Sequence, residues 1–424
     1  MKKSLIVAMA MALGVSATAF AANPFSDLPA GHWAYASVAK LAAAGVVDGY
    51  PDGTFKGDKT MTRYEMAQIV AKALAKGAIG TDDRLVGEFA DELDNLGVRV
   101  AKLEKKSDNV RLTGNFRIHY ANNNLKSAYG TERGKHGGKF RSRLFFNGEV
   151  NDNWTYTGMI QNDQVYAASN MEENKTGDSV TKFQRAYIQG KLGDAVTLTG
   201  GRFGTFIGDG NVYDSRVDAV KVEVGKDIKF TAEYGKMADA DITCHCVDHG
   251  NNVESVADKY YRIGLGAKFG DFGLETNYVK AQNVNTMGMH YTDDKIWTIG
   301  AEYTGGDFNA GITYLKGSND DIEKRECSQN GWVAKLGYGE AKSDKPGSFG
   351  VYTKYYNQGA STVIAHTMNG AYDYFGTQGF KGYMVGANYA ILKNMVAAVE
   401  YYDLKGKEND QKARTIWSEL MISF

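Results

Sequence analysis

The chain has 424 residues and nearly balanced charge, because 49 Lys and Arg stand against 50 Asp and Glu. This balance excludes a uniform electrostatic field that would attract nucleic acid. The chain contains 26 Tyr and 50 Gly but only 4 Pro, none of them within an expected strand. Scarce Pro and abundant Tyr are typical of a lipid-facing β-barrel, because Pro removes a donor from the ladder and Tyr favours membrane interfaces.

Residues 1–21 are expected to be a secretory signal peptide. Lys2 and Lys3 give the basic start, residues 5–20 the apolar stretch, and Ala19 to Ala21 the cleavage site. An uncleaved membrane helix is the alternative, although the apolar stretch is short and contains small and polar residues. No later stretch is apolar over the length of a membrane helix. The exported chain is therefore expected to enter a membrane only as a barrel.

Residues 22–80 are expected to form a small helical domain. Residues 32–44 and 62–75 have the spacing of amphipathic helices. Gly45 is placed to end the first helix, and turn-forming residues follow at 48–53.

The motifs of this domain resemble, in order and spacing, an S-layer homology (SLH) domain. They are Phe25-x-Asp27, His32-Trp33-Ala34, Leu41, Gly45-Val46-Val47-x-Gly49-Tyr50, Asp52-Gly53-x-Phe55 and Thr62-Arg63-Tyr64-Glu65. Two departures are Tyr64, where the family usually has Ala, and the single copy, where S-layer proteins typically carry three. The resemblance implies binding to a cell-wall glycopolymer or to modified peptidoglycan. For single-copy relatives linked to a barrel, it implies peptidoglycan that carries a polyamine.

Four residues of this domain are candidates for peptidoglycan binding: Arg63, Asp52, Trp33 and Glu65. Each has a structural alternative. Glu65 has capping-box spacing from Thr62. Asp52 lies among turn formers, and Trp33 fits a core position. For Arg63 the alternative is a solvated surface charge, and a ligand role is favoured because the helix dipole opposes a cation in the first turn.

Residues 81–108 are expected to form a trimeric coiled-coil stalk. Their apolar residues recur at alternating spacings of three and four, as an a/d seam requires. The seam consists of Val86, Phe89, Leu93, Leu96, Val100 and Leu103. The alternative is a single amphipathic helix on the barrel mouth, because the run is short for a coiled coil and contains Gly97.

Residues 109–424 are expected to form an all-β transmembrane barrel of sixteen antiparallel strands, which is a porin-like architecture. The expected strands are 110–120, 139–151, 153–165, 181–192, 196–203, 216–225, 228–236, 258–269, 272–281, 293–304, 307–316, 330–340, 347–356, 379–389, 395–405 and 412–424. Tight turns alternate with longer connections, among them 122–138, 237–257 and 357–378. Short turns face the periplasm in such barrels, so the helical domain and the stalk are expected beside the cell wall.

The last expected strand, RTIWSELMISF, alternates between an apolar and a more polar face. Ile416, Ser418, Leu420, Ile422 and Phe424 share one face. This segment resembles the carboxyl-terminal signal by which bacterial outer-membrane barrels are recognised and inserted.

Charged residues with inward parity predict a water-filled lumen. The candidate pore-lining residues are Arg117, Arg141, Arg143 and Arg185, opposed by Asp209 and Asp214. Both Asp lie in residues 204–215, the third long loop, which resembles the loop that folds into the pore of sixteen-stranded general porins. We expect a transverse field that filters solutes by charge. A plain surface loop with solvated arginines is the alternative.

Cys244, Cys246 and Cys327 fall in expected extracellular loops. Cys244-x-Cys246-x-x-His249 has no second ligand pair at a zinc spacing, so no metal site is expected. A disulfide between Cys327 and one of the other two is favoured in an exported protein. No nucleophile–base set, phosphate loop or HExxH motif is readable, so neither an enzyme nor a cofactor is expected.

The order of signal peptide, SLH domain, stalk and barrel resembles that of the OmpM-type outer-membrane porins. This resemblance implies a homotrimer in the cell outer membrane, with the SLH domain and the stalk in the periplasm. The implied partners are polyamine-modified peptidoglycan, outer-membrane lipid, and small hydrophilic solutes and ions. The expected function is diffusion of these solutes together with tethering of the outer membrane to peptidoglycan. One rival is a plugged barrel that serves only as a wall anchor, and another is a barrel-embedded hydrolase.

Overall fold

The computed structural model describes residues 25–29, 31–32, 35–43, 45–75, 84–95, 110–168, 181–238, 255–284 and 292–424. The chain divides into two units, residues 1–109 and 110–424, and each is described by itself. The expected signal peptide lies outside the described residues.

The described residues of the first unit form four short helices: α2 (Tyr35–Ala43), α3 (Arg63–Ala75), α4 (Arg84–Glu88) and α5 (Ala90–Asn95). The two predicted helices are confirmed as α2 and α3. Their apolar residues build two small cores, one around Phe25 and Val38 and one around Val70 and Leu93. Among the described helices, none has the length and the apolar composition needed to cross a bilayer.

The first half of the predicted stalk forms the two short helices α4 and α5, which pack onto α3, and the trimeric stalk as a whole stays a prediction. Val86, Phe89 and Leu93, the first half of the expected seam, pack onto Ala67 and Val70 of α3. Leu93 is only 2% exposed, so it has no surface left for a partner helix. The heptad spacing arises here because an apolar stripe that covers a neighbouring helix has nearly the same period as a coiled-coil seam. Leu96, Val100 and Leu103 lie outside the described residues.

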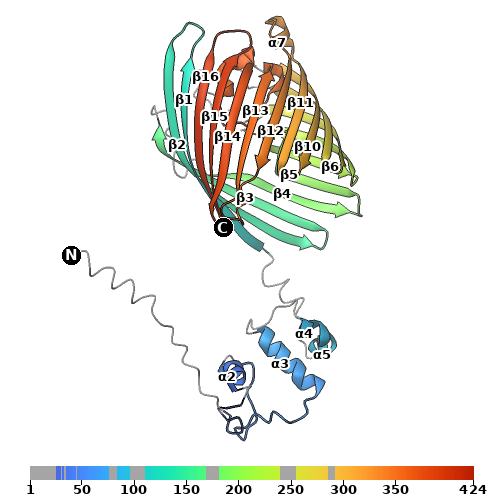
Figure 1. Ribbon diagram of the computed structural model, residues 1–424. Coiled ribbons are helices and arrows are strands. Elements are labelled where there is room, and N and C mark those ends of the chain that lie inside the picture. The colour runs from blue at the N-terminus through green and yellow to red at the C-terminus, as the bar shows by residue number, and fades with distance from the viewer. Residues whose placement is uncertain are drawn as a thin grey trace, which may run out of the picture. The chain divides into compact units, whose positions relative to one another are not determined.

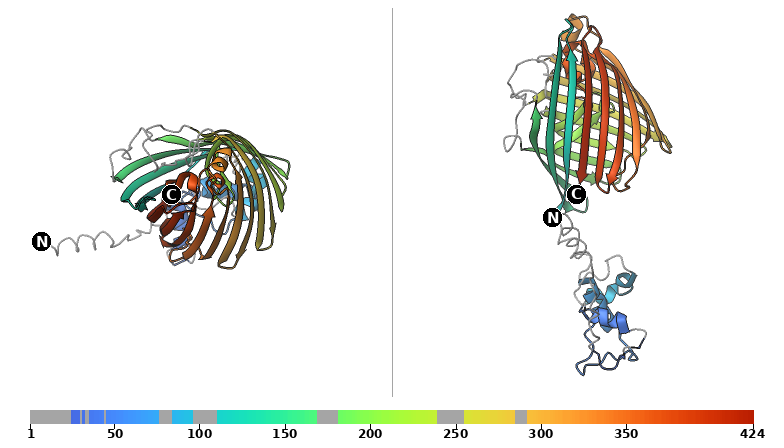
Figure 2. Two further views of the ribbon diagram at one scale, coloured as in Figure 1. Left: turned by 90° about the horizontal axis from the view of Figure 1, so that it is seen from above. Right: turned by 60° about the vertical axis from the view of Figure 1, so that its left-hand side comes forward.

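The second unit is a closed barrel of sixteen strands in which each strand pairs with its sequence neighbours and β1 pairs with β16 (Figures 1 and 2). The strands are β1 (Val110–Lys126), β2 (Glu132–Asn151), β3 (Trp154–Ala168), β4 (Lys182–Leu192), β5 (Val196–Ile207), β6 (Tyr213–Val224), β7 (Ile228–Ala238), β8 (Ser255–Phe269), β9 (Phe272–Val284), β10 (Thr292–Gly305), β11 (Phe308–Ser318), β12 (Asn330–Gly339), β13 (Phe349–Gln358), β14 (Phe380–Leu392), β15 (Met395–Gly406) and β16 (Lys412–Ser423). The predicted number and antiparallel order of the strands are confirmed.

Strand ends differ from the prediction where polar residues continue the ladder. Strands β1 and β2 remain paired up to Lys126 and Glu132, so a tight turn replaces the expected 122–138 loop. Their last residues include Asn and Gly, which strands generally disfavour, and cross-strand pairing overrides that weak preference. The other helical elements of this unit are α7 (Asp320–Lys324), η3 (Ala360–Thr362) and η4 (Tyr372–Gln378).

The barrel closes along the seam between β1 and β16. The backbone N–H of Gly114 donates to the Phe424 carbonyl at 2.8 Å, and the N–H of Phe424 donates back at 3.0 Å. A Cβ atom at Gly114 would overlap the Phe424 ring, so the glycine leaves room for that ring over β1. The predicted alternation of β16 is confirmed, because Ile416 is 52% exposed on the outer face and Trp417 is 8% exposed.

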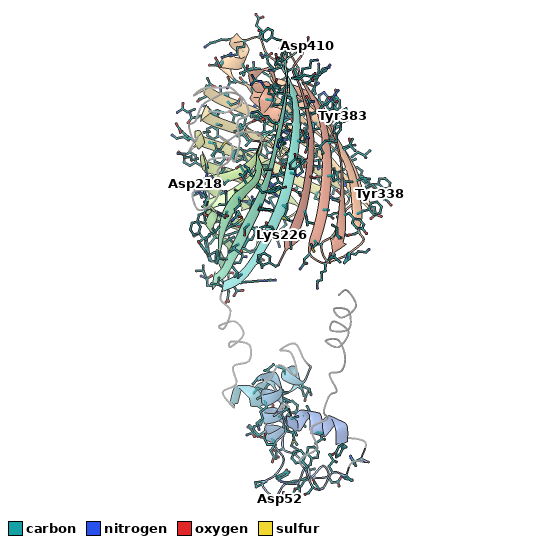
Figure 3. The ribbon with its side chains drawn as sticks, turned by 90° about the vertical axis from the view of Figure 1, so that its left-hand side faces the viewer. Asp52, Asp218, Lys226, Tyr338, Tyr383 and Asp410 are labelled. Atoms are coloured by element: carbon teal, nitrogen blue, oxygen red, sulfur yellow. The ribbon has the colours of Figure 1, made fainter. Side chains whose placement is uncertain are left out.

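Two rows of aromatic side chains, named girdles here, run along part of the outer wall, and each continues from strand to strand. The loop-side girdle contains Tyr234, Tyr261, Tyr278, Trp297, Tyr314, Trp332, Tyr355, Tyr383 and Tyr401, from β7 to β15. The turn-side girdle contains Phe269, Phe272, Tyr303, Phe308, Tyr338, Phe349 and Tyr389, from β8 to β14. Figure 3 shows Tyr383 and Tyr338, one from each girdle, projecting outward at different heights. Such girdles border the apolar band of a membrane barrel.

Candidate functional site

The hairpin of β5 and β6 extends into the barrel and reaches its far wall. Residues 204–215 are not a long loop, because the two strands continue to Ile207 and from Tyr213 and leave a five-residue tip. At this tip, Lys335 Nζ of β12 donates to Asp209 Oδ1 at 3.0 Å. Lys354 Nζ of β13 donates to Asp209 Oδ2 at 3.5 Å. Since β13 lies eight strands from β5 in the ring of sixteen, the tip crosses the lumen.

A second segment, residues 359–379 between β13 and β14, also lies inside the barrel. Its N–H groups at Ile364 and Ala365 donate to the Val212 carbonyl at 2.9 and 3.0 Å. Ile364 is fully buried and Phe375 is 2% exposed. The expected extracellular loop 357–378 is therefore corrected to an inward-folded lumen segment. The sequence did not predict this burial, because the apolar residues of an irregular segment recur at neither the strand period nor the helix period.

Polar contacts attach the lumen segment to β15. The Glu400 carboxylate accepts hydrogen bonds from Tyr402 Oη at 2.6 Å, Asn369 Nδ2 at 2.8 Å and Tyr352 Oη at 3.0 Å. The segment ends at Gly379, which has a positive φ of 63° and whose missing side chain avoids the Gln358 carbonyl. The two inserted elements and the strands around them share one apolar core that occupies part of the lumen.

Arginines line the part of the lumen formed by β1 and β2. Arg117 and Arg141 are direct partners in the ladder, and Arg143 lies two residues further along β2. Arg143 Nε donates to Gln161 Oε1 at 2.7 Å, and Arg117 Nη1 lies 3.5 Å from Glu419 Oε2. We name Arg117, Arg141 and Arg143 the arginine wall. Among the described residues, the carboxylates of Asp163 and Glu419 are the negative charges that act on Arg141 of this wall.

Arg185 and the two predicted aspartates are placed differently from one another. A Cβ atom at Gly204 would lie 2.6 Å from Arg185 Nη2, so the guanidinium group covers the β5 backbone at this glycine. Asp214 is exposed and is one of the charges that act on Arg185. The expectation that Asp209 opposes the arginines is corrected, because its carboxylate pairs with Lys335 and Lys354.

Sequence reasoning missed several residues that hold the hairpin in place. Within the lumen, the nearly buried Glu233 carboxylate pairs with Arg262 Nη1 at 3.1 Å. It also accepts hydrogen bonds from Thr205 Oγ1 at 2.9 Å and Tyr260 Oη at 3.0 Å. Strand parity indicates that Lys335 faces inward. It does not indicate which distant carboxylate that lysine meets, because the pairing depends on the path of the hairpin.

The predicted wall-binding residue Arg63 makes contacts within its own domain. Its Nε donates to Glu92 Oε1 at 2.5 Å, and its Nη2 donates to the Glu88 carbonyl at 2.9 Å. The guanidinium group also lies 4.9 Å from the centre of the Phe89 ring. Arg63 thus joins α3 to α4 and α5, and the pKa of Glu92 is lowered chiefly by its hydrogen bond with Arg63.

Asp52 and Glu65 adopt the structural roles that were weighed against ligand binding. Asp52 Oδ1 accepts from Thr54 Oγ1 at 2.5 Å, and the hydrogen bond with Lys56 is the main cause that lowers the pKa of Asp52 to about 2. Glu65 Oε2 accepts the Thr62 N–H at 2.8 Å, and Thr62 Oγ1 accepts the Glu65 N–H at 3.2 Å. This reciprocal pair is a capping box. Trp33 lies outside the described residues.

The thiol and metal expectations concern residues that are mostly outside the described part of the chain. Cys327 is a free thiol, so the expected disulfide involving it is not formed. Cys244, Cys246 and His249 are not among the described residues. Within the described ranges, no group of His, Cys, Asp and Glu is arranged to hold a metal ion.

Comparison with known families identifies the first unit. The model of the S-layer homology domain matches residues 24–67. These residues form an S-layer homology domain. The outer membrane protein SlpA of Thermus thermophilus is 39% identical to the chain over 135 residues, which cover 26% of the chain and 14% of SlpA. The outer membrane protein alpha of Thermotoga maritima is 44% identical over 75 residues, which cover 16% of the chain and 19% of that protein.

Comparison with solved structures concerns the barrel. OmpF of Salmonella typhi superposes with a TM-score of 0.50 over 74% of the chain and 97% of OmpF, at 13% sequence identity. At this identity the likeness shows the fold alone, which is a porin barrel. The SLH domain and the porin fold together are what the resemblance to OmpM-type proteins implied. The chain spans only a small part of the length of the two relatives SlpA and alpha.

Proposed function

We propose that the chain is an outer-membrane channel for small hydrophilic solutes that is also tethered to peptidoglycan through its SLH domain. The observation that carries this proposal is the joining, in one chain, of an SLH domain and a closed porin barrel with arginines along its lumen. The barrel lies in the outer membrane, and the SLH domain lies in the periplasm. A polyamine-modified peptidoglycan as ligand and a homotrimeric assembly are finer parts of the same proposal.

A channel is favoured over the plugged wall anchor by the distribution of apolar residues in the lumen. The apolar core involves the β5–β6 hairpin and the lumen segment, but Leu125 is its only buried member among the described residues of β1 to β4. The arginine wall on β1 and β2 is therefore left beside space that water and ions can enter. Charged side chains that line a wet passage are the usual basis of solute selection in porins.

Single-channel recording in planar bilayers tests the transport part. We expect the wild-type chain to conduct, and Gly379→Val to conduct more, because a β-branched residue suits neither the positive φ nor the close Gln358 carbonyl. Gly347→Val is the matched control, since Gly347 has a φ of 86° but no atom within 4 Å of its Cβ position. A wild-type barrel that stays closed while Gly379→Val conducts would support the plugged anchor instead.

Sedimentation of the full-length protein with purified peptidoglycan tests the tethering part. We expect binding to amine-decorated peptidoglycan and weaker binding to peptidoglycan from which the amine has been removed. Two variants, Arg63→Ala and Glu92→Gln, distinguish contact of Arg63 with the ligand from its role in packing the helices. Both break the same ion pair, but only the first removes the guanidinium group. Loss of binding in Arg63→Ala alone assigns Arg63 to the ligand, and equal loss in both variants assigns it to packing.

A further inference from the structure

Lysines follow the loop-side girdle on the outer wall at a constant spacing. On six strands, an outward-facing lysine lies two residues beyond the girdle aromatic, on the side of the long connections. These lysines are Lys236, Lys259, Lys280, Lys295, Lys316 and Lys381. Because side chains two residues apart share one face of a strand, each lysine lies directly beyond its aromatic neighbour. We name these six residues the lysine collar.

The turn-side girdle has no such collar. Two residues beyond its aromatics, towards the short turns, lie Asp271, Gly270, Gly305, Gly306, Glu340, Gly347 and Ile391. The outer wall therefore carries excess positive charge at one membrane boundary only. Aromatic girdles mark the interface with the lipid head groups, so the collar lies at the level of the head groups on the long-connection side.

Most collar ammonium groups have no carboxylate partner in the described part of the chain. Lys280 pairs with Asp293 at 3.5 Å, whereas Lys236, Lys259, Lys295 and Lys316 are exposed and form no ion pair there. Lys280 and Lys295 are also direct partners in the ladder between β9 and β10. Like charges directly opposite each other destabilise a sheet, and an anion between them removes that cost.

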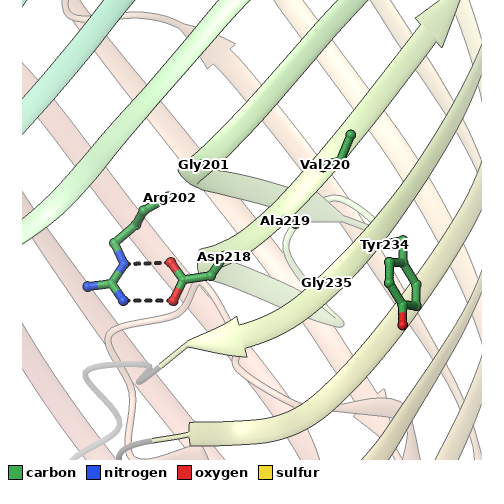
Figure 4. Close-up of a pocket in the computed structure, with 7 residues that line it drawn as sticks. All are labelled: Gly201, Arg202, Asp218, Ala219, Val220, Tyr234 and Gly235. Carbon is green, nitrogen blue, oxygen red and sulfur yellow. Dashed lines mark hydrogen bonds and ion pairs between the residues drawn. The ribbon is translucent and has the colours of Figure 1, made fainter.

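At one end of the collar, an open groove on the outer face of β5, β6 and β7 adds a place for an acyl chain (Figure 4). Val220 and Tyr234, each 58% exposed, form its apolar wall. Arg202 donates from Nε and Nη2 to the Asp218 carboxylate at 2.6 and 2.7 Å, and Lys236 faces Asp218 in the ladder. Charged groups therefore lie beside the apolar wall of the groove.

We propose that the lysine collar binds the phosphate groups of an outer-leaflet lipid of the lipid A type, whose acyl chains lie against the girdle and the groove. This inference rests on the proposed outer-membrane location. The charge pattern favours a phosphate-bearing lipid because lysines at a head-group boundary attract anionic lipids. Their alkyl chains remain in the apolar layer while the ammonium groups reach the phosphates.

The test compares two variants with the same change in charge. Lys236, Lys259, Lys295 and Lys316 are replaced by Gln in the collar variant. The exposed turn lysines Lys226, Lys342, Lys345 and Lys393 are replaced by Gln in the control variant. Binding of lipid A with two phosphates, and of the same lipid without phosphates, is measured by native mass spectrometry on the full-length protein in detergent.

We expect wild type and the control variant to prefer the phosphorylated lipid, and the collar variant to bind it about tenfold or more weakly. No preference in wild type, or an undiminished preference in the collar variant, would overturn the proposal. A change of oligomeric state in the collar variant without a change in lipid preference would assign the collar to a contact between copies of the chain.

Two further measurements keep the result interpretable. If the collar variant fails to assemble, amine acetylation of wild type with and without lipid A replaces it. Protection of the four collar lysines but not of the four turn lysines is then expected, and equal labelling would contradict the proposal. Conductance of the collar variant in a neutral bilayer reports the proposed channel function separately, because the collar lies on the outer wall and not in the lumen.

Discussion

Charged residues have different roles in the SLH domain and in the barrel lumen. In the domain, Asp52, Arg63 and Glu65 all make contacts with their own unit, as a turn, a helix-to-helix bridge and a cap. In the lumen, Arg117, Arg141 and Arg143 gather on the neighbouring strands β1 and β2. The domain has only two small apolar cores, so polar contacts add to its stability, whereas the closed ladder already holds the barrel. Charge changes should therefore alter folding in the first unit and transport in the second.

The largest effect is expected from removal of two charges of the arginine wall. Arg141→Ser together with Arg143→Ser should shift the reversal potential in a salt gradient towards cation selectivity. Barrel stability should change little, because the lumen is wet and screened. Lys342→Ser with Lys345→Ser, in an exposed turn, is the control with the same charge change. An unchanged reversal potential in the arginine variant would place the wall away from the narrowest part of the passage.

A smaller and opposite shift is expected from Asp209→Asn. The substitution removes the carboxylate that Lys335 and Lys354 share, while Lys335 keeps its ion pair with Glu302 at 3.1 Å. The lumen thereby loses one negative charge, which favours anions. Asn also tolerates the positive φ of 55° at this position, so the hairpin backbone is not strained by the change itself. Measurement of the reversal potential decides the sign. A shift towards cations would show that the hairpin rearranges when the ion pairs are lost.

In the SLH domain, Thr62→Ala should weaken the start of α3 by about 1 kcal/mol through loss of the cap. Hydrogen exchange of the full-length protein should show faster exchange in the first turn of α3, and unchanged exchange in the barrel strands. Thr54→Ala, which removes a hydroxyl outside the helix, is the control. Equal exchange in wild type and Thr62→Ala would contradict the role of the capping box.

The smallest effect is expected when the pH is lowered, and it concerns the stability of the SLH domain. The pKa values of Asp52 and Glu92 are lowered in the folded domain, that of Asp52 from 3.8 to about 2. The Asp52 carboxylate therefore stabilises the domain fully above pH about 4, and its contribution is lost as the pH falls towards about 2. The contribution of Glu92 is lost in the same direction, as the pH falls. Exchange in α3 and α5 should rise over that range, modestly because exposed charges are screened, and high salt should reduce the difference. A rise on going from pH 5 to 7 would contradict this assignment.

Much of the barrel could be predicted because its signal is repeated. Each strand shows period-2 alternation, and the sixteen-strand count depends on no single boundary. The path of the β5–β6 hairpin could not be predicted, because Asp209 meets Lys335 across more than one hundred intervening residues. The lumen segment was missed since irregular backbone carries no period. In the SLH domain the capping box follows from local spacing, whereas the pairing of Arg63 with Glu92 depends on how α5 packs on α3.

The seam between β1 and β16 has a consequence for how the barrel can assemble. Thr415 Oγ1 donates to Asn123 Oδ1 across 292 positions of sequence, so the closing contacts are among the most distant in the chain. Contacts between residues so far apart in sequence form late and slowly, because the chain between them must first lose conformational entropy. Until then, β1 presents an open edge that can pair with any available strand. Before the ring closes, the exported chain therefore needs a partner protein that covers this edge. That need should end when β1 pairs with β16.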